Sequence, residues 1–186
     1  FTEDDEFNFE FAENIDIKIT DKCDIGCPFC HEGSTVTGKH GDLFNQAFWN
    51  TLHPGQEVAL GGGNVLEHPD FLKLLVHLKK SRVIANITVN QKHYIENYQF
   101  LEMLHSRGFI RGIGVSLVDP KILPTRFCDD IVYHVINRII TTEQLDSLDK
   151  DSKVLILGYK TLRRGTTYST SLDNQEKLKQ KLIDYM

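Results

Sequence analysis

The run Cys23-Asp-Ile-Gly-Cys-Pro-Phe-Cys-His31 places three cysteines within eight residues, directly after the alternating apolar segment 15–20. Thiolates are soft ligands, and three of them on one loop form a set that can bind a metal. With their C-x3-C-x2-C spacing, Cys23, Cys27 and Cys30 can hold three irons of a [4Fe-4S] cubane while the fourth iron stays open to a small molecule. Gly26 and Pro28 suit the bends that wrapping around a cluster requires.

Three other interpretations of these cysteines stay open beside the cluster. A disulfide framework fits poorly, because three of the four cysteines of the chain crowd into one loop. A structural zinc site could use Cys23, Cys27, Cys30 and His31, although the adjacent Cys30 and His31 would strain a single tetrahedron. The thiols could also be buried without any ligand. The spacing favours the iron-sulfur cluster over these alternatives.

Short β-branched runs separated by helix-like segments predict an α/β fold. Most of these runs are almost entirely apolar, as is typical of strands covered on both faces. Alternating βα units give parallel strands, and right-handed crossovers curl them into a partial (β/α)6 TIM-like barrel. The predicted strands are 15–20, 58–61, 83–89, 112–117, 131–136 and 154–157, and the predicted helices are roughly 43–52, 71–80, 94–107, 141–148 and 172–185.

Capping residues support the helix boundaries. Pro69-Asp70 stands ahead of the second helix, Thr141-Thr142 with Glu143 ahead of the fourth, and Ser171 ahead of the last. Gly108 is expected to end the third helix.

Length and composition fit one globular domain. A chain of 186 residues, 40% hydrophobic and 25% charged, is large enough to bury about 70% of its unfolded surface. We expect this domain to span 15–186, after an acidic segment, 1–14, that is either an edge strand or flap or a mobile tail. The chain begins at Phe1 instead of Met, so we expect a longer natural protein.

Charge and hydropathy argue against nucleic acid and membrane as partners. The net charge of -5 and the scattered basic residues argue against a broad nucleic-acid surface. The sequence contains neither an apolar run near 18 residues nor a basic-apolar leader. We therefore expect a cytoplasmic protein, and a reducing cytosol suits an oxygen-sensitive cluster.

The cysteine spacing, with Phe29 before the last cysteine and a strand before the first, resembles the radical S-adenosylmethionine (SAM) superfamily. The stretch 58–71, Val-Ala-Leu-Gly-Gly-Gly-Asn-Val-Leu-Glu-His-Pro-Asp-Phe, is similar to the Gly-Gly-Glu-Pro motif of that family and its following helix. Asn64 replaces the usual Glu, and Val65 the usual Pro. The resemblance covers nearly the whole chain in the order of its strands. It implies the same partial barrel, a [4Fe-4S] cluster on the three cysteines, and SAM as the second cofactor.

Residues that follow the predicted strands are the candidate cofactor site, because parallel α/β folds bind ligands at the carboxyl ends of their strands. Glycines there let backbone approach the SAM ammonium, or simply form a tight turn. The Asn64 amide can accept from that ammonium without a charge. Hydroxyl and amide groups suit the ribose and carboxylate, although each could equally be a cap or a solvated turn, and the resemblance implies backbone contacts to adenine. The expected cofactor-binding residues are Phe29, His31, Gly62, Gly63, Asn64, Asn90, Ser116, Asn137 and Leu157.

The resemblance implies an enzyme that uses an external one-electron reductant. Reductive cleavage of SAM gives methionine and a 5′-deoxyadenosyl radical, which abstracts hydrogen from a substrate. A barrel of only six strands leaves a lateral opening wide enough for a peptide or a nucleoside. The alternative from a different class is a non-catalytic interaction module whose cysteines hold zinc or a structural cluster.

Overall fold

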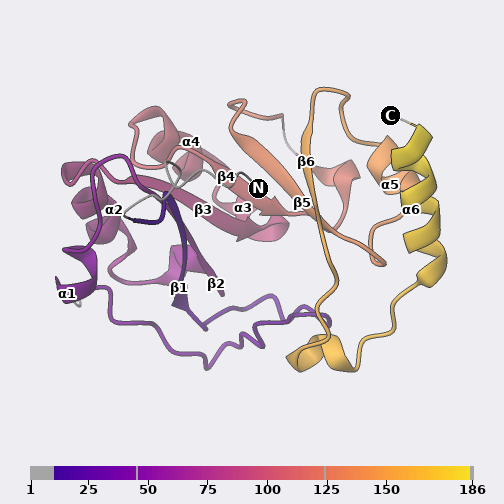
Figure 1. Ribbon diagram of the computed structural model, residues 1–186, viewed down its shortest axis with the longest axis horizontal. Coiled ribbons are helices and arrows are strands. Elements are labelled where there is room, and N and C mark those ends of the chain that lie inside the picture. Colours follow the sequence, from indigo (N-terminus) through magenta and orange to yellow (C-terminus); the bar gives the residue numbers. More distant parts are fainter. Residues whose placement is uncertain (1–10, 45, 124, 185–186) are drawn as a thin grey trace, which may run out of the picture.

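A computed structural model of the protein describes residues 11–44, 46–123 and 125–184. Its six strands are all parallel and follow one another in the sheet in the order of the chain (Figure 1). In the described residues no ladder joins the first strand to the last, so the barrel is open. The predicted partial (β/α)6 barrel is therefore confirmed. The strands are β1 (Asn14–Thr20), β2 (Glu57–Gly62), β3 (Ile84–Asn90), β4 (Ile113–Ser116), β5 (Ile131–Ile136) and β6 (Lys153–Leu157), each within one residue of its predicted bounds.

Helices alternate with the strands, as predicted, and differ from the prediction in length. The predicted helix 43–52 is a single turn, and the predicted helix 94–107 is two helices that meet at Asn97. The Asn97 side chain donates to the His93 carbonyl at 2.9 Å and caps the first of these two helices. The helices are α1 (Gln46–Trp49), α2 (Phe71–Lys80), α3 (Gln91–Glu96), α4 (Tyr98–Ser106), α5 (Thr142–Asp146) and α6 (Leu172–Asp184), with 3-10 turns η2 (Val65–Glu67), η3 (Pro120–Ile122) and η4 (Arg163–Thr166).

The capping predictions hold at most helix ends. Thr141 caps α5 through a capping box, but its partner is Gln144 and not Glu143. The Ser171 hydroxyl accepts from the amide of Asn174 at the start of α6. Gly108 has φ +63° just after α4, a conformation that favours glycine. Asp70 precedes α2 but makes no side-chain capping bond.

Burial alternates along the central strands, so only one face of the sheet is fully covered. In β3, for example, Ala85, Ile87 and Val89 are buried, whereas Thr88 and Asn90 are half-buried. The expectation of strands covered on both faces is therefore wrong, because an open barrel leaves its inner face accessible. This inner face carries the polar side chains of β3, β4 and β5.

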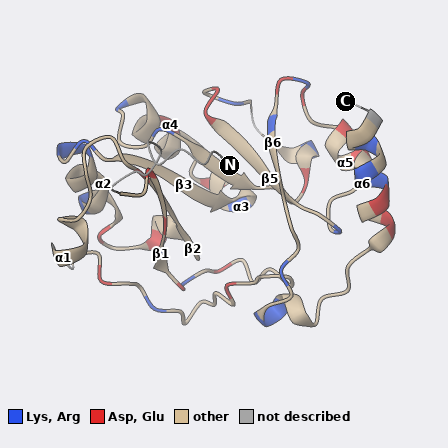
Figure 2. Ribbon diagram, viewed as in Figure 1, with Lys and Arg blue, Asp and Glu red and all other residues tan. Residues whose placement is uncertain are grey.

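Basic and acidic residues are interspersed along the ribbon, most clearly in α6 (Figure 2). None of the described helices is both long and apolar enough to cross a membrane. Most of the acidic segment 1–14 lies outside the described residues. Just before β1, the Glu13 carbonyl accepts from the Glu57 amide at 2.8 Å and so extends the contact between β1 and β2.

Candidate functional site

Residues 21–34, which we call the cysteine loop, follow β1 and fold back against the strand end. The Cys23 amide donates to the Thr35 carbonyl at 2.9 Å, and the Thr35 amide donates to the Asp21 carbonyl at 3.1 Å. Gly26 has φ +66°, so a glycine is favoured at that bend of the loop. A turn follows in which the Cys30 amide donates to the Cys27 carbonyl at 3.2 Å.

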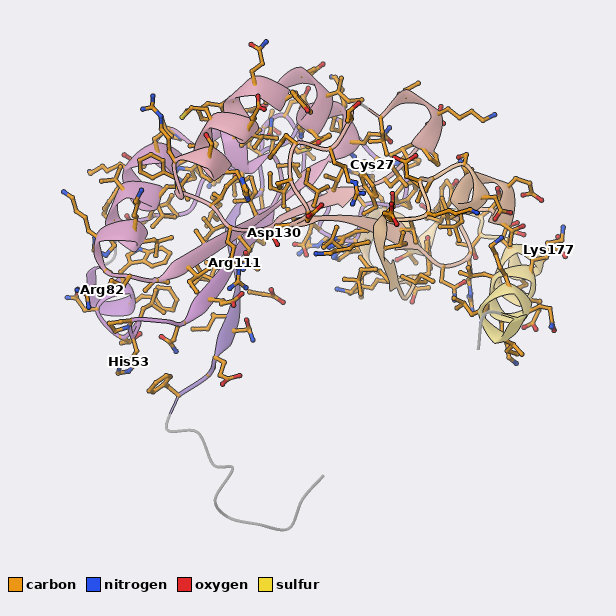
Figure 3. The ribbon with its side chains drawn as sticks, turned by 90° about the horizontal axis from the view of Figure 1, so that it is seen from above. Cys27, His53, Arg82, Arg111, Asp130 and Lys177 are labelled. Atoms are coloured by element: carbon orange, nitrogen blue, oxygen red, sulfur yellow. The ribbon has the colours of Figure 1, made fainter. Side chains whose placement is uncertain are left out.

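The three cysteines of this loop line one cleft at the carboxyl ends of the strands, here called the strand-end cleft. All three are free and half-buried. Burial raises the pKa of the Cys23 and Cys27 thiols, and the neighbouring thiol of Cys30 raises both further. The three sulfurs are thus close enough to influence one another electrostatically. In Figure 3, Cys27 is separated from Arg111 and Asp130, which precede β4 and β5 and so lie at the amino ends of these strands.

A different trio has ligand atoms close enough to share a single ion. Within the described residues, the potential ligand atoms of Cys23, Asp24 and His93 all lie within 4.8 Å of one another. His31 is not part of this group, so the Cys3His zinc tetrahedron is not assembled here. A cubane binds each thiolate through a different iron, so its ligands lie farther apart than those of one ion. Among the described residues, the sulfurs of Cys23, Cys27 and Cys30 do not form such a close group, and the ligands of a cubane need not do so.

Polar side chains from three adjacent strands form a row along the cleft. Asn90, Ser116 and His134 are register partners across β3, β4 and β5. The Asn90 amide nitrogen lies 3.8 Å from the Cys27 sulfur, which links this row to the cysteine loop. His134 was not predicted, because it lies inside its strand instead of after it; an imidazole within the otherwise largely apolar run Ile131–Ile136 was the available signal. Burial lowers the pKa of His134, so the ring is neutral at neutral pH.

The glycine turn after β2 packs tightly on the loop after β1. A Cβ atom on Gly63 would lie 2.1 Å from the Lys22 carbonyl oxygen, and Gly62 has φ +114°. Both glycines line the strand-end cleft. The lack of a side chain at Gly62 and Gly63 therefore lets the two loops pack together and also leaves room for a ligand.

Two predicted cofactor-binding residues do not line the strand-end cleft. Asn64 caps η2, since its oxygen accepts from the Leu66 amide and its nitrogen donates to Glu67, both at 3.2 Å. Asn137 donates its backbone amide to the Leu157 carbonyl at 2.8 Å, and its buried side-chain oxygen has no partner among the described residues. The structure brings together the other seven, which are Phe29, His31, Gly62, Gly63, Asn90, Ser116 and Leu157.

Ser34, which the sequence analysis did not single out, offers a free hydroxyl to a bound group in the cleft. Ser34 lines the cleft with only 3% of its surface exposed, and its hydroxyl has no hydrogen-bond partner among the described residues. A buried hydroxyl without a partner costs about 1–3 kcal/mol, so a ligand that supplies the partner is favoured. Three soft thiols, this hydroxyl and close-approach glycines together fit an iron-sulfur cluster with a polar cofactor.

A solved structure has a fold similar to the open (β/α)6 barrel described above. Streptococcus suis SuiB, in its structure bound to the precursor peptide SuiA, is similar to this chain with a TM-score of 0.66 and 16% sequence identity. The similarity covers 94% of this chain and 46% of SuiB, so the chain spans less than half the length of that protein. At this identity the likeness establishes the fold alone. No protein-family model matches the chain, and no curated protein matches it.

Proposed function

We propose that this protein is a radical SAM enzyme whose cluster ligands are Cys23, Cys27 and Cys30. The observation that carries the proposal is the convergence of three free thiols on one cleft at the strand ends of a radical SAM-like fold. When bound, a [4Fe-4S] cluster would supply one electron for reductive cleavage of SAM, giving the 5′-deoxyadenosyl radical that takes hydrogen from a substrate.

Different residues of the strand-end cleft would bind different groups of SAM. The backbone at Gly62 and Gly63, which line the cleft, would receive the ammonium in place of the Asn64 side chain, which is occupied by its cap. Asn90 and Ser116 offer amide and hydroxyl groups to the carboxylate and ribose. The adenine would pack against Phe29, His31 and Leu157, which also line the cleft.

A groove beside this cleft supports a peptide substrate with an apolar side chain. The groove shares Ile25, Asn90 and Val118 with the strand-end cleft, so an occupant would lie next to the reaction. Val118 is 50% exposed and Ile122 is 61% exposed, and with Ile25 and Ile95 they give the groove an apolar lining. SuiB, whose solved structure holds a precursor peptide, has a similar fold. A peptide is therefore favoured over a nucleoside, for which this groove offers few polar groups.

The cellular setting follows from the cluster. An exposed iron-sulfur cluster is sensitive to oxygen, so we place the enzyme in the reducing cytoplasm together with an external one-electron reductant.

Metal analysis after anaerobic reconstitution separates this proposal from the non-catalytic zinc module. The proposal predicts about four irons per chain and broad absorption at about 400 nm, both lost in single alanine variants of the three cysteines. Cys128→Ala is the matched control, because Cys128 lies outside the cleft and packs against the core. Stoichiometric zinc without iron in the wild type would instead support the interaction module.

A further inference from the structure

Arg164 in η4 joins two points of the cysteine loop through its guanidinium group. Its Nε donates to the Cys27 carbonyl at 2.9 Å, and its Nη2 donates to the Ser34 carbonyl at 2.9 Å. These partners lie 137 and 130 positions away in the sequence. Because a guanidinium is planar and its donors are fixed relative to one another, two simultaneous bonds define the separation of the two carbonyls.

The segment around Arg164 is seated closely on the same loop. A Cβ atom on Gly165 would lie 3.5 Å from the Phe29 carbonyl oxygen. The rings of Phe29 and Tyr168 meet edge to face with their centroids 5.4 Å apart. A Cβ atom on Gly33, at φ +68°, would lie 2.6 Å from Cδ of Arg163. Close approaches at Gly33 and Gly165 and the contact between Phe29 and Tyr168 thus pack η4 and the residues after it against the cysteine loop.

This contact spans the opening of the barrel. The cysteine loop follows β1 and η4 follows β6, and these strands are the two opposite edges of the sheet. Figure 1 shows the chain after β1 running along the lower side of the molecule to meet η4. Among the described residues, the other backbone hydrogen bonds of the Cys27 to Gly33 stretch are local turns. Arg164 therefore supplies a long-range bond that this stretch otherwise lacks on its backbone.

We propose that Arg164 is a positioning residue that fixes the ligand-bearing part of the cysteine loop. By bridging the Cys27 and Ser34 carbonyls it holds the Cys27 and Cys30 thiols toward Cys23 before any metal is bound. Its positive charge also lies beside the ligand Cys27, where it favours the more negative, reduced form of a bound cluster. The assignment of the metal rests on the proposed function, whereas the fixing of the loop does not.

Hydrogen exchange of the metal-free protein tests the positioning role without any cofactor. In Arg164→Ala, the hydrogen-bonded amides of Cys30 and Gly33 should exchange at least about tenfold faster, because the turns that protect them lose two anchoring hydrogen bonds. Arg164→Lys should behave similarly, because one ammonium group cannot reproduce the two-point bridge. Arg126→Ala is the matched control, since Arg126 also donates to a loop carbonyl, that of Asp151 at 3.0 Å, but far from the cysteines in sequence. Unchanged protection in Arg164→Ala, or full protection in Arg164→Lys, would overturn the inference.

A second readout uses the reconstituted protein. Iron content should fall in Arg164→Ala, and the midpoint potential of the remaining cluster should be lower in Arg164→Gln than in Arg164→Lys, which keeps the charge. If the wild type takes up no cluster, the proposed function fails while the exchange experiment still decides the role of Arg164. If the wild type and all Arg164 variants have the same iron content per chain and the same midpoint potential, the inference fails, and the proposed function is not affected. Should Arg164→Ala not fold, Arg164→Gln, which keeps one donor, supports the exchange comparison.

Discussion

The imidazole Nε2 of His93, buried on α3, lies 2.6 Å from a carboxylate oxygen of Asp24 in the cysteine loop. Lys92 adds a second contact to the same carboxylate at 3.1 Å. Asp24 directly follows Cys23, so this pair ties the start of the cysteine loop to the helix after β3. The hydrogen bond from His93, and then that from Lys92, lower the pKa of Asp24 to about 2.

The Asp24 contacts predict a specific acid sensitivity. A carboxylate with a lowered pKa stabilises the fold above its ordinary pKa of 3.8, and this contribution is lost as the pH falls toward about 2. Asp24→Asn should therefore lower the melting temperature at pH 7 and flatten its decline between about pH 4 and pH 2. Thermal melts across this range measure the effect. Asp173→Asn, which removes an exposed helix pair with Lys177, is the control, and identical acid profiles for wild type and Asp24→Asn would contradict the role of the pair.

Replacing Asn64 by Glu should not tighten SAM binding, although the sequence motif of the family suggests that it would. The Asn64 amide caps η2 and contacts Glu67, so a Glu at position 64 removes the cap and adds a like charge. We expect a loss of about 1 kcal/mol in stability, partly restored in Asn64→Glu with Glu67→Gln. Melting curves and SAM titrations check both effects. A SAM affinity about tenfold higher in Asn64→Glu, with unchanged stability, would place residue 64 at the ammonium after all.

Ser116→Ala tests whether the end of β4 contacts the cofactor. Loss of a hydrogen bond to the ribose or carboxylate of SAM should cost about 1–2 kcal/mol, a roughly five- to thirtyfold loss of affinity. The melting temperature should change little, because Ser116 lies on the half-open inner face. Ser147→Ala, which removes an exposed hydroxyl at the end of α5, should leave SAM binding unchanged. Lower stability with intact SAM binding would show that Ser116 is structural.

Gly114 keeps the inner face open for His134. A Cβ atom at position 114 would lie 2.5 Å from Cε1 of His134 and 3.1 Å from Oγ1 of Thr88. Gly114→Ala should therefore displace the His134 ring and destabilise the protein by about 1–3 kcal/mol. His134→Ala in the same chain should recover most of this loss by removing the clash. If the double variant is no more stable than Gly114→Ala, the two residues do not compete for the same space.

Strand positions were predictable because the signal is local. Runs such as Ile131–Ile136 are apolar and β-branched, and turn residues separate them from the next helix, so the boundaries followed within one residue. Residues after each strand were predictable as a site because parallel strands end at one edge. His134 was missed because the predicted site took only the residues that follow each strand, whereas His134 lies within one.

Contacts between segments that are distant in the chain could not be predicted from the sequence. Arg164 lies 137 positions from Cys27, and no pattern of charge or spacing links the two. For Asn64 a local signal was present but overlooked, since an Asn just before a short helical turn is typical of a cap. The motif of the resembled family drew attention to a ligand at that position instead.

The most direct test of the central claim is reductive SAM cleavage by the anaerobically reconstituted protein. With a strong one-electron reductant, the wild type should convert SAM to equal amounts of methionine and 5′-deoxyadenosine, and SAM should change the electron paramagnetic resonance signal of the reduced cluster. Single alanine variants of Cys23, Cys27 and Cys30 should lose this activity while Cys128→Ala keeps it. A wild-type protein that carries a full cluster, but neither cleaves SAM nor changes its resonance signal when SAM is added, would contradict the assignment as a radical SAM enzyme.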